Sequence, residues 1–248
     1  MAPLTEREFW PADHRHVIAI DGPAAAGKST VARLLADRLG AMLFDTGALY
    51  RAVALAAIRR GVPPDAASAL CELARNIDIR IQPPSQQDGR LYDVWLDGED
   101  VTWAVREPAV SAVVSQIAEH AKVRSALLPL QRRIAAMGPV VMVGRDIGTV
   151  VVPDAGLKIF LDASPAERAR RRYQEAEARG GHVTYTDVLR DTLQRDALDS
   201  TRQTAPLRAA PDAVLIKTDN LSIEEVVVEI EALARSRTTA SGERLWPV

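Results

Sequence analysis

Residues 17–39 read VIAIDGPAAAGKSTVARLLADRL. A short apolar run leads into residues 22–29, which fit the pattern G-x-x-x-x-G-K-[ST], and a helical stretch follows. In such a loop, backbone N–H groups surround a polyphosphate, the helix N-terminus faces its charge, and the Lys and Ser side chains reach the phosphates and Mg²⁺. The sequence therefore predicts a nucleoside triphosphate site. Its expected members are Gly22, Pro23, Ala24, Ala25, Ala26, Gly27, Lys28, Ser29 and Thr30.

The composition is that of a globular chain that binds a small anion. The 248 residues are 47% hydrophobic and 26% charged, which is enough for a full hydrophobic core. The formal net charge of −2 gives no general basic field for nucleic acid or an anionic membrane. Cys71 is the single cysteine, and neither a signal peptide nor a run of about 20 apolar residues is evident. We expect a monomeric cytoplasmic protein without nucleic-acid or membrane partners.

Short apolar runs alternate with longer segments of helical period along most of the chain. This pattern is typical of a parallel sheet flanked by helices, so we expect an α/β fold with a five-stranded parallel sheet. The expected strands are 17–21, 41–44, 140–143, 157–161 and 213–216, and the expected helices are 28–39, 48–60, 165–178, 186–198 and 223–234.

Residues 77–101 interrupt this alternation. The segments 77–81 and 91–96 alternate apolar with polar residues, and they are punctuated by the turn-forming pairs Pro83-Pro84, Asp88-Gly89 and Asp97-Gly98. We expect a small antiparallel sheet inserted into the core, followed by helices at 107–119 and 123–137. The expected organisation is an N-terminal tail (1–16), a core (17–75 and 139–235), an insert (76–138) and a C-terminal tail (236–248).

The remaining motifs must decide which phosphate chemistry the loop serves. The chain has no Asn-Lys-x-Asp motif and no D-x-x-G switch at a strand end, which argues against a GTPase. It has grouped arginines instead. Arg168, Arg171 and Arg172 share one face of the expected helix 165–178, where they would close over a transferring phosphoryl group. A solvated face paired with Glu167 and Glu175 remains an alternative.

A second group is Arg195, Asp199 and Arg202, which also share a helix face. The carboxylate suits sugar hydroxyls, and an arginine fork suits phosphate oxygens. An ordinary helix-stabilising ion pair is the alternative reading of this spacing.

Two strand ends carry further polar residues. Arg145 and Asp146 follow the strand 140–143, where ligands sit in open α/β sheets, although Asp146 alone also suits a turn. Thr46 follows the strand 41–44 and is placed to cap the next helix, and Arg51 lies one turn later, within reach of an anion at the helix start. We therefore expect both strand ends to border the ligand.

Five segments together resemble bacterial cytidylate kinases: 21–30, 45–51, 144–155, 158–163 and 195–202. The stretch 144–155 reads GRDIGTVVVPDA and separates this family from adenylate, guanylate and shikimate kinases. The similarity runs from about residue 17 to residue 234. It implies a P-loop kinase fold in which the insert 76–138 binds the nucleoside monophosphate and residues 164–182 form a helical lid.

The resemblance also implies Mg²⁺-dependent phosphoryl transfer from ATP to CMP and dCMP. It assigns cytosine to Ser115, Arg124 and Asp146, the ribose to Arg195 and Asp199, and the acceptor phosphate to Thr46, Arg51, Arg145 and Arg202. It makes Lys28, Arg145, Arg202, Arg168 and Arg172 the catalytic cations, and the Ser29 hydroxyl a Mg²⁺ ligand.

One position departs from the family pattern. The family carries Asp or Glu directly before Gly-Arg-Asp, and this chain carries Val143. Asp21 and Asp45, at the ends of neighbouring strands, are candidates to replace that acid. A nucleotide-binding module with little turnover, and a kinase for another small acceptor such as UMP, AMP or shikimate, therefore remain as alternatives.

Overall fold

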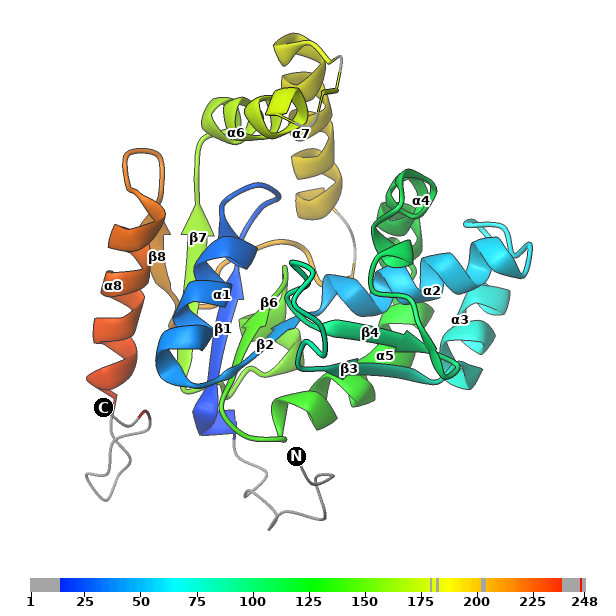
Figure 1. The fold of residues 1–248 in the computed structure, drawn as a ribbon, viewed down its shortest axis with the longest axis horizontal. Coiled ribbons are helices and arrows are strands. Elements are labelled where there is room, and N and C mark those ends of the chain that lie inside the picture. The colour runs from blue at the N-terminus through cyan, green and yellow to red at the C-terminus, as the bar shows by residue number, and fades with distance from the viewer. Residues whose placement is uncertain (1–13, 179, 182, 202–203, 238–245, 247–248) are drawn as a thin grey trace.

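A computed structural model describes residues 14–178, 180–181, 183–201, 204–237 and 246. Five parallel strands form the central sheet in the order β2-β6-β1-β7-β8, as the sequence predicts (Figure 1). Every residue of β1 and β6 is buried, which explains why both strands read as continuous apolar runs. The five strands are β1 (Val17–Asp21), β2 (Met42–Asp45), β6 (Val140–Val143), β7 (Leu157–Asp162) and β8 (Val214–Lys217).

Helices cover this sheet. Helix α1 contacts β1, β2 and β6, helix α8 lies beside α1 and contacts β7, and a single π-helical turn, η3, contacts β1. A capping box between Ser222 and Glu225 fixes the start of α8. The described helices are η1 (His14–His16), α1 (Lys28–Leu39), α2 (Gly47–Arg59), α3 (Ala67–Asn76), η2 (Ala104–Arg106), α4 (Pro108–Glu119), α5 (Ala121–Ala135), η3 (Ile147–Val151), α6 (Pro165–Ala178), α7 (Tyr185–Thr201) and α8 (Ile223–Arg235).

The insert contains an antiparallel sheet, and this prediction is confirmed. Strand β4 (Asp93–Leu96) lies between β3 (Ile79–Gln82) and β5 (Glu99–Asp100). Asp97 and Gly98 join β4 to β5 with φ values of 50° and 86°, because a two-residue hairpin loop of this kind needs two left-handed residues. The short third strand was not expected from the sequence.

Helices α6 and α7 pack on each other beyond the carboxyl ends of β1 and β7, at the top of Figure 1. The end of β1 leads into the phosphate loop, so this helix pair stands over that loop. Within the described ranges, no helix is both long and apolar enough to cross a bilayer. The residue bounds given above for core, insert, lid and tails, the monomeric state and the cytoplasmic location stay predictions.

Candidate active site

The phosphate loop between β1 and α1 passes very close to β7. Gly22 has a φ of +145°, and a Cβ atom there would lie 2.0 Å from the carbonyl oxygen of Leu161, so a side chain does not fit. Gly27 precedes α1 with a left-handed φ of 88° and provides no side-chain cap. The first N–H groups of α1 therefore have no capping side chain, and an anion at this helix end is favoured.

Lys28 is a buried cation in this loop. Its ammonium donates to the carbonyl oxygens of Gly22 at 2.8 Å and Pro23 at 2.6 Å. Burial and the nearby charge of Arg145 hold the pKa of Lys28 well below its ordinary value, although Asp45 opposes the shift. An anion bound in the loop would therefore stabilise the charged ammonium.

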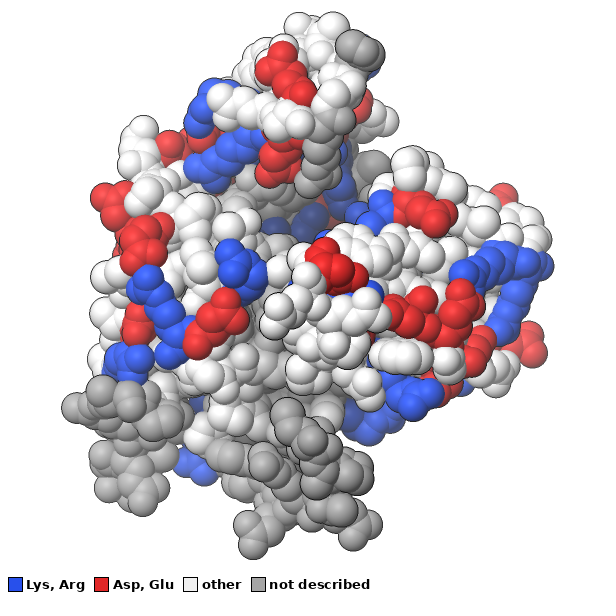
Figure 2. Space-filling view, in the orientation of Figure 1, with Lys and Arg blue, Asp and Glu red and all other residues white. Residues whose placement is uncertain are grey.

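A cavity of about 750 Å³ opens over the loop and the ends of β2 and β6. Figure 2 shows Lys and Arg atoms at the bottom of the hollow below α6 and α7. Cationic side chains outnumber acidic ones by eight to five in the lining, so the cavity favours an anionic ligand. The predicted residues that line it are Ala24, Ala25, Gly27, Lys28, Ser29, Thr30, Thr46, Arg51, Ser115, Arg124, Arg145, Asp146, Arg172, Arg195 and Asp199.

The end of β2 brings Asp45 to the phosphate loop. The Ser29 hydroxyl donates to Asp45 Oδ2 at 3.2 Å, and the N–H of Gly47 donates to the other carboxylate oxygen at 2.9 Å. Thr46 precedes α2, but its side chain does not cap the helix: the hydroxyl donates to the carbonyl oxygen of Val143 at 3.0 Å. The capping role expected for Thr46 is therefore wrong, because the hydroxyl ties β2 to β6 instead.

The end of β6 carries the most specific pairing in the cavity. Asp146 accepts a hydrogen bond from Arg124 of α5, and the Arg124 guanidinium lies 5.4 Å from the Tyr50 ring centroid. Next to it, Arg145 Nε donates to Asp199 Oδ2 at 2.8 Å. Two carboxylates are thus each held by an arginine from a distant segment, which fixes their orientation.

Asp21 joins the loop to the segment after β6. Its carboxylate accepts the N–H groups of Ile147 and Gly148, both at 2.8 Å. Burial raises the pKa of Asp21 to about 6, although these two hydrogen bonds oppose the shift. Asp21 therefore serves as a buried bridge, which leaves Asp45 as the acid beside Ser29.

The arginines that the sequence groups on α6 divide into two kinds. Arg168 is buried and does not line the cavity, since its guanidinium donates to Asp196 of α7 at 2.8 Å and to the carbonyl oxygen of Ala24 at 3.2 Å. Arg171 donates to the carbonyl oxygen of Thr218 at 2.6 Å and reaches the cavity wall. The three arginines therefore do not act together as expected: Arg168 makes a structural contact with α7, whereas Arg171 and Arg172 line the cavity.

Arg195 and Asp199 of α7 line the cavity together. Burial, followed by the charge of Arg145, lowers the pKa of Arg195 to about 10, and its Nε–H has no hydrogen-bond partner among the described residues. Such a group favours an anionic or carbonyl ligand. Arg202, the third member of this predicted group, lies outside the described residues.

Sequence reasoning missed two contacts of the site. Asp196, which pairs with Arg168, lies 28 positions further along the chain, so its role depends on how α6 and α7 pack. Arg106 lines the cavity from the end of η2. Its position just after the inserted strands was the only available signal.

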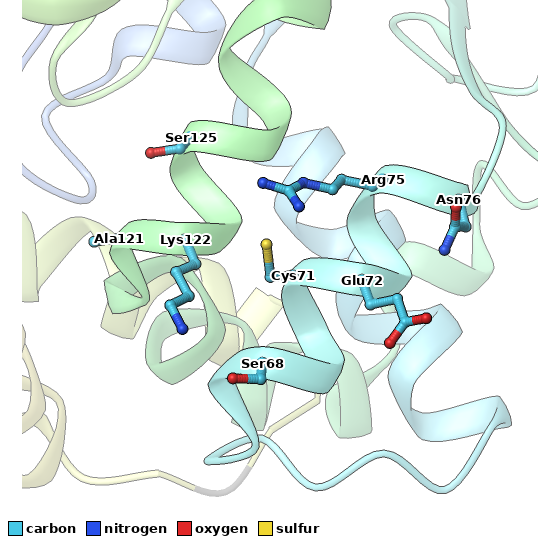
Figure 3. Close-up of a pocket in the computed structure, with 8 residues that line it drawn as sticks. All are labelled: Ser68, Cys71, Glu72, Arg75, Asn76, Ala121, Lys122 and Ser125. Atoms are coloured by element: carbon cyan, nitrogen blue, oxygen red, sulfur yellow. The ribbon is translucent and has the colours of Figure 1, made fainter.

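A second hollow, of about 810 Å³, lies between α3 and α5 (Figure 3). Cys71 is buried and points its sulfur between the side chains of Arg75 and Lys122. The lining comes from these two helices alone, and neither the phosphate loop nor a strand end contributes to it. The phosphate chemistry therefore belongs to the cavity over the loop.

Comparison with known proteins agrees with this geometry. The sequence model of the family described as cytidylate kinase matches residues 18–236. The cytidylate kinase of Herpetosiphon aurantiacus is 50% identical over 218 residues, 88% of this chain and 93% of that protein. Those of Geobacter sulfurreducens (48% over 225 residues, 91% and 95%) and Pelotomaculum thermopropionicum (51% over 215 residues, 87% and 94%) are similarly related. This chain belongs to the cytidylate kinase family.

Proposed function

We propose that this chain transfers the γ-phosphoryl group of ATP to CMP or dCMP, giving ADP and CDP or dCDP. The observation that carries the proposal is that the phosphate loop and the Arg124–Asp146 pair border the same cavity. A donor site and a base-reading site on one cavity suit direct transfer between two nucleotides. The family relatives support the same activity.

The donor phosphates belong to the phosphate loop. The helix end at Gly27 and the backbone of the loop favour the triphosphate, and Lys28 would exchange its two carbonyl acceptors for phosphate oxygens. The triphosphate charge also offsets the burial that lowers the pKa of Lys28. ATP binding and a charged Lys28 therefore favour each other.

The residues beside the loop suit Mg²⁺, a hard cation that prefers oxygen ligands. Ser29 Oγ and Asp45 Oδ2 lie 3.2 Å apart, whereas Val143 offers no side-chain oxygen. Ser29 would hold the metal, with Asp45 orienting its bound water in place of the family acid. When bound, Mg²⁺ neutralises charge on the β- and γ-phosphates. In the described part of the chain no cluster of three His, Cys, Asp or Glu side chains forms a metal cage, which suits an ion held mainly by ATP oxygens.

The acceptor phosphate needs positive charge and alignment, and no protein nucleophile. Thr46, Arg51 and Arg145 line the cavity, and with Arg202 they are the residues proposed to hold this phosphate. One of its oxygens attacks the γ-phosphorus in line while the bond to the β-γ bridging oxygen breaks. Arg172 of the lid would stabilise the negative charge that spreads over the transferring group.

The nucleoside is read by paired groups. Cytosine presents an amino donor at N4 and acceptors at N3 and O2, so Asp146 would accept from N4 while Arg124 and Ser115 donate to the ring. Uracil places a carbonyl oxygen opposite Asp146, which disfavours UMP. Arg195 and Asp199 lie on the same wall and are proposed to bind the ribose.

A steady-state assay with ATP, Mg²⁺ and CMP tests the proposal. We expect CDP formation, and lower kcat/KM for UMP, AMP and shikimate. CMP binding without CDP formation would identify a nucleotide-binding module without turnover. A higher kcat/KM for another acceptor would instead reject the base-reading role of Arg124 and Asp146.

A further inference from the structure

Arg106 is a cation at the cavity wall that has no role in the proposal above. It is the last residue of η2 and follows the inserted sheet. Its guanidinium carbon lies 5.7 Å from the ring centroid of Tyr92 and 5.4 Å from that of Trp103. Among the described residues, Arg106 forms no ion pair with a carboxylate. Its charge is therefore stacked on aromatic rings and not neutralised by an acid.

The insert holds the two rings in different ways: Tyr92 is buried, whereas Trp103 is 47% exposed and is held by a hydrogen bond. Trp103 Nε1 donates to Asp88 Oδ2 at 2.9 Å, and Arg90 Nη2 donates to the same oxygen, also at 2.9 Å. These two donors hold the pKa of Asp88 well below its usual range, with Arg90 the larger cause. Arg90 is itself buried and also bonds Asp93 at 2.9 Å. Trp103 is therefore oriented by an exposed carboxylate, Asp88, which the buried Arg90 holds in place.

Arg106 lies close to the site proposed for the acceptor phosphate. Arg51 Nη1 donates to the carbonyl oxygen of Val105, the residue before Arg106, at 3.1 Å. Burial raises the pKa of Tyr92 above its ordinary value, and the charge of Asp45 adds to this rise. The charges of Arg106 and Arg51 oppose it, as does a side-chain hydrogen bond between Arg106 and Tyr92. Arg51 and Arg106 also line the same cavity. The two arginines thus belong to one cationic wall.

An arginine beside aromatic rings can still bind an anion. The guanidinium is a planar group with five N–H donors at its edge, and one side-chain hydrogen bond to Tyr92 leaves further donors for a ligand. A fork of this kind matches two phosphate oxygens. An exposed arginine with the same ring contacts and no ligand is the competing explanation, and it predicts no effect on nucleotide affinity.

We propose that Arg106 binds the phosphate of the acceptor nucleotide and that Tyr92 and Trp103 position it. The inserted sheet then contributes directly to recognition of the phosphate, besides its structural role. This inference rests on the proposed function, because it assigns a further residue to the same acceptor site. Cytidine, which lacks the phosphate, should be insensitive to Arg106.

The test compares CMP with cytidine by calorimetry on the full chain without ATP. Arg106→Gln should weaken CMP binding about tenfold, which corresponds to about 1.4 kcal/mol, the value of one charge-assisted hydrogen bond. The affinity for cytidine should stay within about twofold of the wild-type value. Arg106→Lys keeps the charge and should retain more CMP affinity than Arg106→Gln. Arg133→Gln, an exposed arginine of α5 outside the cavity, is the matched control and should bind CMP like the wild type.

Two results would overturn the inference. Unchanged CMP affinity in Arg106→Gln would show that Arg106 does not contact the phosphate. Equal weakening of CMP and cytidine binding would show that Arg106 acts on the structure of the insert. Thermal unfolding of each variant separates the second result from a general loss of fold. Failure of the wild type to bind CMP or form CDP would instead reject the proposed function itself.

Discussion

The donor side of the cavity comes from one continuous segment, residues 22–30, whereas its acceptor side collects side chains from α2, α5, α7 and the end of β6. The donor side has one cation, Lys28, which contacts backbone carbonyl oxygens. The acceptor side has several arginines, and two of them are paired with acids, Arg124 with Asp146 and Arg145 with Asp199. The side built from one segment thus has a single cation on carbonyl oxygens, and the side built from several elements has arginines paired with acids.

The difference bears on what each side does before a ligand arrives. Arginines gathered from separate elements repel one another, and acids among them offset this repulsion in the free protein. A nucleotide must then compete with those acids for the arginines. Only a nucleotide whose own donors and acceptors match the paired groups is expected to bind well. On the donor side, Lys28 donates to two uncharged carbonyl oxygens, which compete with a phosphate less than a carboxylate would, so we expect this side to bind any triphosphate that the loop accommodates. Specificity is therefore expected on the acceptor side.

Removing the donor cation should have the largest effect. Lys28→Ala takes away the charge that stabilises the transferring phosphates, so we expect kcat to fall about 10³-fold with a much smaller change in CMP affinity. A coupled ADP assay and CMP calorimetry measure the two quantities. Lys122→Ala, in the hollow of Figure 3, is the matched control with unchanged kcat. A loss below tenfold for Lys28→Ala would contradict a donor side that depends on one cation.

The second prediction concerns Asp21, which joins the two sides. Because burial raises its pKa to about 6, the folded protein binds a proton there more tightly than the unfolded chain. Stability from this group is present below about pH 4 and is lost as the pH rises to about 6, by up to about 3 kcal/mol. Asp21→Asn cannot ionise, so its free energy of unfolding should increase relative to the wild type over this range.

Urea unfolding of both proteins between pH 4 and pH 8 measures this difference. The amide of the Asp21→Asn variant has one acceptor oxygen, so it can lose one of the two hydrogen bonds to Ile147 and Gly148. This loss lowers the free energy of unfolding by an amount that does not vary with pH, so the pH dependence of the difference is still a valid test. A difference that stays flat between pH 4 and pH 6 would show that Asp21 titrates normally and that the bridge to Ile147 and Gly148 is not buried as described.

The donor side could be predicted from the sequence because its determinants are local. The loop pattern, the strand before it and the helix after it lie within 23 consecutive residues, and β1 and α1 have the expected bounds. The turn at residues 97–98 could be predicted in the same way, since Asp and Gly adopt the left-handed conformation that this turn requires. Thr46 shows the limit: a capping position is local, but the hydroxyl found a better acceptor on β6, nearly a hundred residues away.

The acceptor side should lose specificity when its acid is removed. Asp146→Ala is expected to lower kcat/KM for CMP about 10²-fold and to reduce the preference for CMP over UMP, because the site loses the acceptor for the N4 amino group. ATP affinity should stay unchanged, since the donor side is intact. Competition kinetics with CMP and UMP measure the ratio.

Asp146→Ala also leaves Arg124 buried without its partner, so thermal unfolding must accompany the kinetics. Asp65→Ala, an exposed acid outside the cavity, is the matched control. Equal losses of ATP and CMP affinity would mean that Asp146 acts on the fold of both sides and not on the base.

Convergence of the acceptor side could be predicted only as a tendency. The spacing of Arg195 and Asp199 indicated one shared face, but not that Asp199 pairs with Arg145. The three arginines of α6 also shared a face by spacing, and α7 then buried Arg168 through Asp196. Helix period places side chains around one axis, and the packing of a second helix decides which of them stay free.

The smallest effect on kcat is expected for Arg172, which lies one helical turn from the buried Arg168 on α6 and lines the cavity. Arg172→Ala should lower kcat about tenfold, the share of one charge at the edge of the transferring group, and leave the fold intact. Arg168→Ala should instead destabilise the protein by about 2 kcal/mol, less than a fully buried pair because Asp196 is partly exposed. Thermal unfolding and kcat, measured on both variants, separate the two roles. An unchanged kcat for Arg172→Ala would place both arginines among the structural contacts, and the lid would then contribute no charge to the reaction.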